Sequence, residues 1–286
     1  NLAPRDRELQ GWPGYRGSHP VRVGNAAGAQ HQLDVYGWVI DAAFVLHEAG
    51  HRLYPETWRA MADFADLVSR RWTEPDAGLW EVPGPPRHYV HSKLMAWLAL
   101  NRAIRMSGSY RTTARRRHRW SAALRAIAAD VAANGYDEER QTYVRSYGSA
   151  ELDAAVLILP VLGLEEPRSP RVVGTIEAIQ RSLGAGGALL HRYPPGGDHL
   201  PGREGAFLAC SFWLVQALAM AGRMDEATSL FEDLISLGGG LGLLAEEADP
   251  ATRGLLGNYP QALTHGALVQ SALAIRDAET SEAHRA

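Results

Sequence analysis

Acidic residues in two loop-like segments have the types and spacing that acid–base chemistry needs. Glu81 directly follows Trp80, and a carboxyl group beside a tryptophan suits a general acid because apolar neighbours favour its protonated form. Glu246 and Glu247 are adjacent in a second segment that ends at Pro250, and one of them could act as a general base. Taken singly, each segment also fits, and more simply, a solvated acidic loop. Two carboxylates that face each other across a pocket, however, are what the hydrolysis of a glycosidic bond requires.

A third segment, His191-Arg192-Tyr193-Pro194, could bind a sugar. The guanidinium group of Arg192 presents a planar fork of donors to hydroxyl groups, and the ring of Tyr193 could stack on a sugar ring. The alternative is an arginine whose aliphatic stem covers apolar surface while its charge stays in water. The local residues leave both interpretations open.

The segment His47-Glu48-Ala49-Gly50-His51 matches the zinc-peptidase pattern H-E-x-x-H. That chemistry needs both histidines on one face of a helix, with the glutamate as the base. Gly50 stands between the histidines and predicts that the helix ends before His51. We therefore interpret the match as fortuitous, keep a zinc peptidase as a remote alternative, and predict neither a metal ion nor another cofactor.

Composition and charge argue against several classes of partner. The net charge is −3, whereas binding to nucleic acid or to an anionic membrane favours a positively charged protein. No apolar run approaches the roughly 20 residues of a membrane-spanning helix. The single cysteine, Cys210, excludes a disulfide within the chain. We expect a cytoplasmic protein that binds neither nucleic acid nor membranes.

Helical periodicity dominates the chain, and strand-like alternation is confined to one short candidate, Thr142 to Tyr147. In the third predicted helix, Leu94, Trp97, Leu98 and Ile104 recur near one face at about 3.6-residue spacing. Glycines stand at the C-terminal ends of several predicted helices, as helix caps do. The predicted helices span residues 31–49, 56–72, 88–107, 111–133, 150–162, 169–183, 205–221, 224–237 and 259–278.

The connections between these helices alternate between short turns and long loops. Helical hairpins in such a series stack side by side, so all long loops emerge on one face and all short turns on the other. An α-solenoid and a closed α/α toroid both fit this pattern, and the polar and aromatic content of the loops favours a toroid with a site at one end. The long loops, which contain the acidic segments and Arg192, span residues 73–87, 134–149, 184–204 and 238–258.

Nine predicted helices cannot close a ring of hairpins, which needs an even number. Residues 1–30 have the character of one more long loop without its preceding helices, so we predict a toroid that lacks its first helices in this chain. Residues 31–279 then form the helical-hairpin barrel and residues 280–286 a tail. An unclosed ring exposes an apolar edge, which makes a homo-oligomer one option.

Taken together, the loops resemble glycoside hydrolase family 15, the family of glucoamylases and bacterial trehalases. Leu79-Trp80-Glu81 is similar to the segment that carries the general acid, and Ala245-Glu246-Glu247 to the segment that carries the general base. His191-Arg192-Tyr193 is similar to the segment whose arginine binds the innermost sugar. The resemblance covers nearly the whole chain in order. Further matching segments are Gly24 to Ala27, Leu33 to Gly37, Gly205 to Phe207 and Leu256 to Ala262.

The resemblance implies an (α/α)6 barrel and an exo-acting, inverting hydrolase that releases β-D-glucose from α-glucosides or from trehalose. Glu81 would be the general acid and Glu246 the general base. The substrate would be an oligosaccharide or a disaccharide, with glucoamylase and trehalase specificity both open. The resemblance also assigns substrate binding to five neighbouring residues, Leu79, Trp80, Arg192, Tyr193 and Glu247.

Three departures from the family pattern affect these expectations. The chain has no β-sandwich domain before the barrel, and it lacks the Trp-Leu-Arg-Asp segment that holds the innermost glucose in bacterial members. Position 38 is Trp38 where those members have glutamate. We expect an incomplete site and little or no activity of the 286 residues alone. The main alternatives are an inactive carbohydrate-binding relative and an α-solenoid scaffold.

Overall fold

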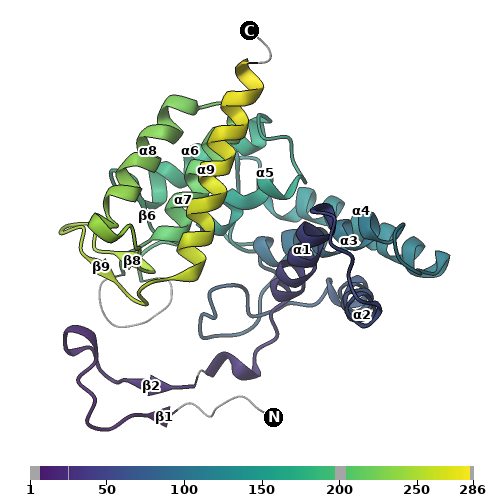
Figure 1. Ribbon diagram of the computed structural model, residues 1–286, viewed down its shortest axis with the longest axis horizontal. Helices are drawn as coiled ribbons and strands as arrows, with labels where there is room; N and C mark the ends of the chain where they lie inside the picture. The colour runs from purple at the N-terminus through teal and green to yellow at the C-terminus, as the bar shows by residue number, and fades with distance from the viewer. Residues whose placement is uncertain (1–6, 25, 197–203, 284–286) are drawn as a thin grey trace.

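A computed structural model describes residues 7–24, 26–196 and 204–283 of the chain. Helical hairpins follow one another around an arc, and short β ladders lie at one end of them (Figure 1). The described helices are α1 (Asp34–Glu48), α2 (Pro55–Arg71), α3 (Val90–Met106), α4 (Ala114–Asn134), α5 (Leu159–Leu162), α6 (Pro170–Leu183), α7 (Leu208–Ala221), α8 (Met224–Ser236) and α9 (Ala262–Ala283). This arrangement confirms the predicted all-α architecture of hairpins.

The helices form an inner and an outer layer. The inner layer contains α1, α3, α5, α7 and α9, and the 3-10 segment η3 (Ala154–Ile158) continues it ahead of α5. The other four helices, α2, α4, α6 and α8, pack on its outside. α7 is buried continuously from Leu208 to Ala219, because neighbouring elements cover it on every side. A helix in this position is apolar all round rather than on one face.

Close helix packing in the inner layer depends on Gly37. A Cβ atom at this position would lie 2.6 Å from the carbonyl oxygen of Met95 in α3. Only a residue without a side chain lets the two backbones approach this closely. The contact holds the start of α1, and the loop residues just before it, against the start of α3.

Short antiparallel ladders tie the long loops together at one end of the hairpins. β3 (Tyr136–Asp137) pairs with β4 (Thr142–Tyr143), and β5 (Gly184–Gly186) pairs with β6 (Leu189–Leu190). β7 (Ala206–Phe207), β8 (Glu247–Ala248) and β9 (Leu255–Leu256) form a three-stranded sheet in that order. Its register places Glu247 opposite Phe207, so two loops far apart in sequence meet at the same edge.

The predicted helix at 150–162 is wrong in its first half. Asp153 is extended, and its side chain caps η3 by accepting a hydrogen bond from the Ala155 amide at 2.8 Å. The Ala154 amide donates to the carbonyl of Arg192 at 2.8 Å, a partner that an α-helix starting at residue 150 would exclude. Tertiary contacts with the neighbouring loop therefore override local periodicity here.

The remaining predicted helices begin within three residues of the observed ones. The region predicted as an N-terminal loop contains β1 (Arg7–Glu8), η1 (Tyr15–Gly17), β2 (Arg22–Val23) and η2 (Ala26–Ala29), and β1 pairs with β2. α9 continues through residues 280–283, which the sequence assigns to the tail. Residues 1–6, Asn25, residues 197–203 and residues 284–286 lie outside the described part of the chain.

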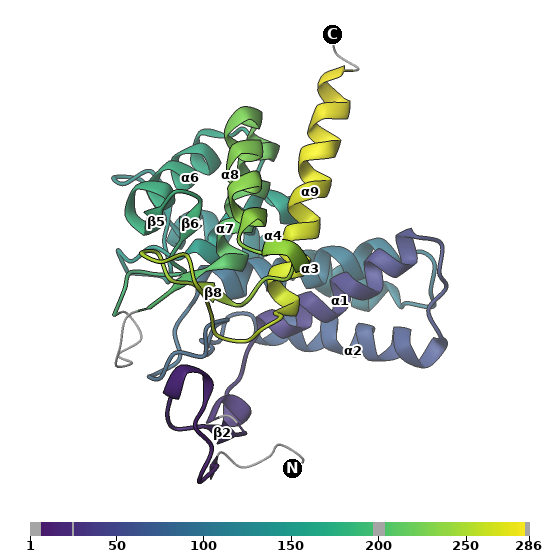
Figure 2. The same cartoon turned by 60° about the vertical axis from the view of Figure 1, so that its left-hand side comes forward.

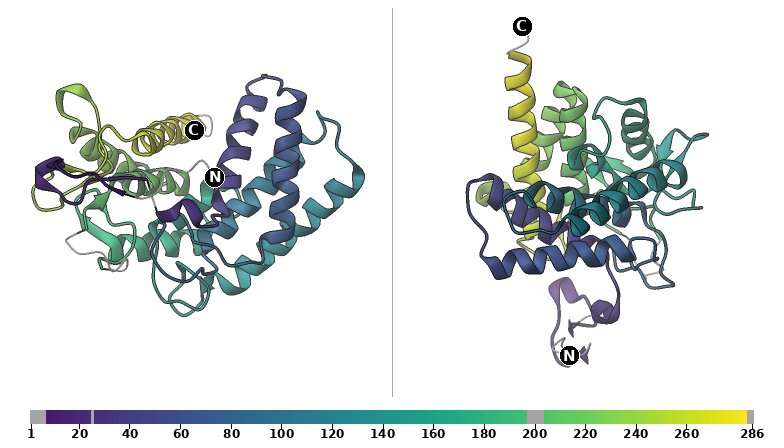
Figure 3. Two further views of the ribbon diagram at one scale, coloured as in Figure 1. Left: turned by 90° about the horizontal axis from the view of Figure 1, so that it is seen from below. Right: turned by 90° about the vertical axis from the view of Figure 1, so that its right-hand side faces the viewer.

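α1 and α9 stand at the two ends of the arc (Figure 3). Each exposes apolar side chains, including Val39 and Leu46 on α1 and Val269 and Leu273 on α9. Within the described residues the arc is therefore open, with an unpartnered helix face on either side of the opening. Among the described helices, none combines the length and the apolar content that crossing a bilayer requires.

Candidate active site

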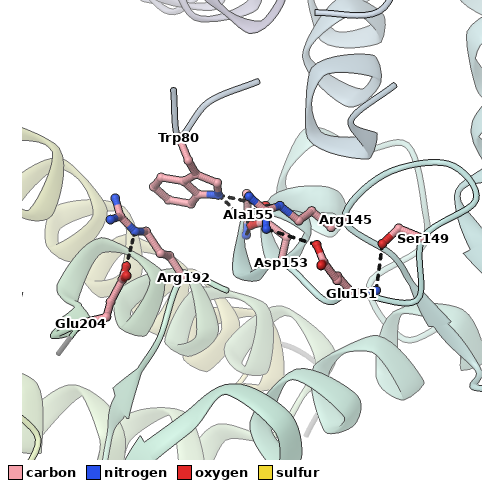
Figure 4. A network of polar contacts seen from close by, with 8 residues as sticks. All are labelled: Trp80, Arg145, Ser149, Glu151, Asp153, Ala155, Arg192 and Glu204. Atoms are coloured by element: carbon pink, nitrogen blue, oxygen red, sulfur yellow. Dashed lines mark hydrogen bonds and ion pairs between the residues drawn. The ribbon is translucent and has the colours of Figure 1, made fainter. Parts of the chain in front are cut away.

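Trp80 lies at the centre of a polar network on the loop face (Figure 4). Its indole Nε1 donates to both carboxylate oxygens of Asp153, at 2.9 Å and 2.9 Å. Its ring packs edge-on against Phe207, with 5.1 Å between ring centroids, and at a tilt against Trp213 at 6.3 Å. The side chain that precedes Glu81 is therefore fixed by hydrogen bonds and by packing.

Asp153 is a buried carboxylate that sequence reasoning missed. Burial raises the pKa of Asp153, while hydrogen bonds from Ala155 and Trp80 and the charge of Arg145 act in the opposite direction. The Arg145 Nε atom lies 3.9 Å from the carboxylate. The sequence did contain a sign of this buried carboxylate. Asp153 stands in an apolar stretch from Leu152 to Leu159, and a charged side chain is buried in such a stretch only where it has hydrogen-bond or ion-pair partners.

Replacing Trp80 by phenylalanine is expected to lower the free energy of unfolding by about 1–3 kcal/mol beyond the loss of ring atoms, because Asp153 loses the donor of two bonds. Trp97→Phe is the matched control, since Trp97 is a core tryptophan with no polar partner in the described part of the chain. Urea unfolding of both variants measures the difference. Equal losses in the two variants would show that the Asp153 bonds contribute nothing.

Arg192 lies over Trp80, pairs with Glu204, and acts through its charge on Glu247. Its Nε lies 2.5 Å from Oε1 of Glu204, and its guanidinium carbon lies 5.6 Å from the centroid of the Trp80 ring. Burial raises the pKa of Glu247, and the positive charge of Arg192 partly offsets that shift. A Cβ atom on Gly205 would come within 2.7 Å of Glu247 Oε2, so the glycine leaves room for this carboxylate.

Tyr193 plays a different part from the one predicted. Only 1% of it is exposed, and the guanidinium groups of Arg145 and Arg192 lie over its ring at 4.6 and 4.8 Å. This corrects the expectation that Tyr193 stacks on a sugar ring, because cations already cover the ring. Tyr193 instead packs against Arg192. Half-buried Leu79 packs against the core and lines a small cavity together with Trp80.

Glu81 has an unusual backbone conformation. Its φ of 55° is in the left-handed region, which costs a non-glycine residue about 1 kcal/mol or more and persists only where neighbours enforce it. Gln32, which lies just before α1, donates from Nε2 to Glu81 Oε1 at 3.1 Å. Gly78, at φ 71°, is pressed against the Tyr89 ring, where a Cβ atom would lie 2.7 Å from the ring. These contacts aim the Glu81 carboxyl group.

The loop before Glu81 is anchored by buried charges. Lys93 donates from Nζ to the carbonyl of Glu74 at 3.0 Å and to the carbonyl of Trp72. Asp76 accepts from the Leu33 amide at 2.9 Å. Burial lowers the pKa of Lys93 and raises that of Asp76. The loop is thus attached to the starts of both α1 and α3.

Asp34 lies close enough to Glu81 for their charges to interact, and burial raises its pKa from 3.8 to about 6. The folded state therefore holds this proton more tightly than the unfolded state does. The stability that protonated Asp34 contributes is complete below pH 4 and is lost as the pH rises through about 6. His91, whose pKa burial lowers to about 4, has the opposite effect in the same range. The two contributions partly cancel in the wild type.

Asp34→Asn is therefore expected to separate the two contributions. Between pH 4 and pH 7 the unfolding free energy of the variant should rise relative to the wild type by up to about 3 kcal/mol, from a pKa shift of about 2 units. Denaturant titrations of both proteins at each pH measure this change. A difference between variant and wild type that stays constant across the range would contradict a raised pKa at Asp34.

Glu246 is held on the loop that precedes α9. Its Oε2 accepts hydrogen bonds from the amide of Asn258 at 3.2 Å and from the side-chain Nδ2 at 3.0 Å. Gly257 lies next to this carboxylate, because a Cβ atom on Gly257 would lie only 2.8 Å from Glu246 Oε2. The loop before α3 and the β8–β9 loop both lie at the same end of the hairpins (Figure 1). Arg192 lies over the ring of Trp80, which precedes Glu81, and its charge acts on Glu247, which follows Glu246.

The two histidines of the zinc-peptidase pattern do not share a helical face. α1 ends at Glu48, and Gly50 has a φ of 85°, so His51 follows the helix. His47 lies with Nδ1 3.3 Å from the hydroxyl of Tyr110, at the short-turn end. In the described ranges no group of three His, Cys, Asp or Glu side chains is placed to hold a metal ion.

Trp38 packs against the core beside His91, with 6.3 Å between the ring centroids. His91 is buried, and neither of its ring nitrogens has a hydrogen-bond partner in the described part of the chain. Trp38 therefore provides apolar cover for a neutral histidine below the loop of Glu81.

Comparison with known proteins relates this geometry to a family. The sequence model described as glycosyl hydrolases family 15 matches residues 3–273. A protein named trehalase from Thermoplasma acidophilum is 36% identical over 273 residues, which cover 96% of this chain and 46% of that protein. A Mycobacterium tuberculosis protein of the same name is 37% identical over 276 residues, with coverage of 96% and 40%. The chain thus spans less than half the length of these relatives.

Solved structures share the fold. A glycosidase variant in complex with glucose superposes with a TM-score of 0.73 at 23% identity, over 91% of this chain and 72% of that one. A bacterial glucoamylase complexed with acarbose gives a TM-score of 0.72 at 14% identity, over 86% and 41%. The arc of hairpins is therefore an (α/α)6-type toroid fold, as predicted. With the family match across residues 3–273 and relatives at 36% and 37% identity, the chain belongs to glycosyl hydrolase family 15.

Proposed function

We propose that this chain carries the catalytic carboxylates and the innermost sugar site of an inverting, exo-acting glycosidase that releases β-D-glucose, with trehalose as its substrate. The observation that supports this best is the position of Arg192, which contacts Trp80 on one acidic loop and interacts with Glu247 on the other. Trehalose is favoured over malto-oligosaccharides because the relatives identical at 36% and 37% are both named trehalase.

In this mechanism Glu81 donates a proton to the glycosidic oxygen as the bond to C1 breaks. A water molecule attacks C1 from the opposite side and gives its proton to Glu246, whose carboxylate Asn258 orients. Inversion requires about 6.5–9.5 Å between the two carboxyl groups, which leaves room for that water. Arg192 would bind hydroxyl groups of the glucose residue, and Trp80 would form one wall of its site.

The anomers formed from trehalose test the proposal directly. Both anomeric carbons of trehalose are α, so inversion at one of them gives β-glucose and leaves the other glucose as the α anomer. Proton NMR should therefore show equal amounts of both anomers before mutarotation, and faster turnover of trehalose than of maltose. α-Glucose alone would indicate retention and would contradict the proposed roles. Absence of glucose would contradict hydrolysis by this chain and would support the expectation from the sequence that these 286 residues alone have little or no activity.

A second candidate is sugar binding without turnover. The open arc favours it, since α1 and α9 expose apolar side chains on either side of the opening. Saturation-transfer NMR with trehalose separates the two candidates, because binding in the absence of glucose release supports only the second.

A further inference from the structure

A small cavity adjoins Trp80 inside the protein. It has a volume of about 10 Å³, which is close to the least room that one water molecule needs. Residues of the loop from Ala77 to Val82 form part of its wall. Three polar side chains also line it, and they come from α3 and from the segment between α4 and η3: His91, Arg145 and Asp153.

His91 has a buried ring without a protein partner. It is the second residue of α3, which packs against α1 in the inner layer (Figure 2). Only 3% of His91 is exposed, and neither Nδ1 nor Nε2 has a hydrogen-bond partner among the described residues. A neutral imidazole has one donor nitrogen and one acceptor nitrogen, and burying both without partners costs free energy. Because buried polar groups in proteins are nearly always hydrogen-bonded, the ring needs a partner from the cavity.

Arg145 brings a second unpaired donor to the same cavity. Its Nε atom has no hydrogen-bond partner within the described ranges, although it lies 3.9 Å from Oδ2 of Asp153. That distance is too long for a hydrogen bond and suits two groups that a water molecule bridges. Both side chains belong to residues that are only 3% exposed, so bulk solvent does not reach them.

One water molecule can satisfy all three side chains. It can accept a hydrogen bond from the Arg145 Nε–H group and donate one to the Asp153 carboxylate, which has acceptor sites to spare. A third bond can join it to a ring nitrogen of His91, and about three bonds are usual for a buried water. Asp153 also accepts both bonds from the Trp80 indole (Figure 4), so the water would strengthen the contacts that fix this ring.

We propose that the cavity holds a buried water molecule through which His91 acts as a positioning residue for Trp80. His91 does not touch the sugar. It holds the water, the water holds Asp153, and Asp153 holds the Trp80 ring. The consequence for sugar binding rests on the proposed function, in which Trp80 forms one wall of the glucose site.

The sign of a stability change tests the water. Leucine has about the volume of histidine and cannot hydrogen-bond, so His91→Leu takes a partner from the water and should lower the urea midpoint of unfolding. In a dry cavity the same change would remove two unpaired polar atoms and would leave the midpoint unchanged or raise it. Thr264→Val shows that second case, because the buried Thr264 hydroxyl also lacks a partner in the described chain but lies outside this cavity.

NMR of the indole groups separates positioning from a general loss of stability. The indole N–H resonance of Trp80, assigned with Trp80→Phe, should shift in His91→Leu, and that of Trp97 should not. Glucose binding should weaken by about 3–10-fold, as the loss of one hydrogen bond does. His91→Gln should restore the resonance, the affinity and the midpoint. Because glutamine also lacks the ring, this recovery assigns the effect to hydrogen bonding.

A crystal structure of the wild-type chain completes the test, with an ordered water expected within hydrogen-bond distance of Arg145 Nε and the His91 ring. A cavity without such a water would overturn the proposal, as would a His91→Leu variant no less stable than the wild type. An unshifted Trp80 resonance in His91→Leu would overturn the positioning role. A chain that shows the shift and its recovery but binds no glucose would overturn the proposed function alone.

Discussion

Glu81→Gln is expected to reduce glucose release from trehalose by roughly 10²–10⁴-fold, the usual contribution of a general acid. Glutamine keeps the shape of the side chain and can still contact Gln32, but it cannot give a proton to the leaving oxygen. Folding should be unaffected, because glutamine has the size of glutamate and its amide oxygen can still accept the bond from Gln32. Initial rates measured with both anomers resolved give the comparison.

A substrate with a different leaving group separates the acid from the base. Fluoride leaves α-D-glucosyl fluoride with little need for a proton, so Glu81→Gln should lose far less activity on it than on trehalose. Glu246→Gln should lose activity on both substrates, since water must still be deprotonated. Glu139→Gln, an exposed glutamate in another long loop, provides the control. Equal losses on both substrates in Glu81→Gln would remove its assignment as the general acid.

Most helices could be predicted because their buried faces and their ends depend on residues that are close together in the sequence. Apolar spacing and terminal glycines placed eight helix starts within three residues, and Gly163 and Gly222 do adopt the left-handed conformation of a cap. The segment before η3 was mispredicted because its backbone bonds to Arg192, which is distant in sequence. The two-residue strand at Thr142 lies within the one stretch predicted to be extended.

The site could be predicted only as far as single segments resemble a family pattern. Arg192 lies over the Trp80 ring and its charge acts on Glu247, whereas Tyr193 is buried against Arg192. The residues that hold the carboxylates were not predictable in this way. Gln32 reaches Glu81 across 49 positions, a relation that no local spacing encodes. Such partners are defined by the packing of loops on the helical scaffold.

The ion pair between Arg192 and Glu204 is expected to contribute to stability and to sugar binding in separable ways. Their side chains are only 19% and 8% exposed, so Arg192→Met removes a cation that lies beside a largely buried carboxylate. This should lower the free energy of unfolding by about 3 kcal/mol and abolish measurable glucose binding. The exposed pair of Arg253 and Asp233, at 38% and 37%, is the control, and Arg253→Met should cost less than about 1 kcal/mol.

The double variant Arg192→Met/Glu204→Gln provides the decisive comparison. The double variant also removes the buried negative charge that Arg192 neutralises, so most of the lost stability should return, because replacing both members of a buried ion pair costs much less than removing one. Glucose binding should not return, because the planar fork of donors is still absent. Denaturant unfolding and sugar titration of the wild type, Arg192→Met, Glu204→Gln and the double variant complete the cycle. Recovery of binding together with stability would show that Arg192 supports the loop only and does not contact the sugar.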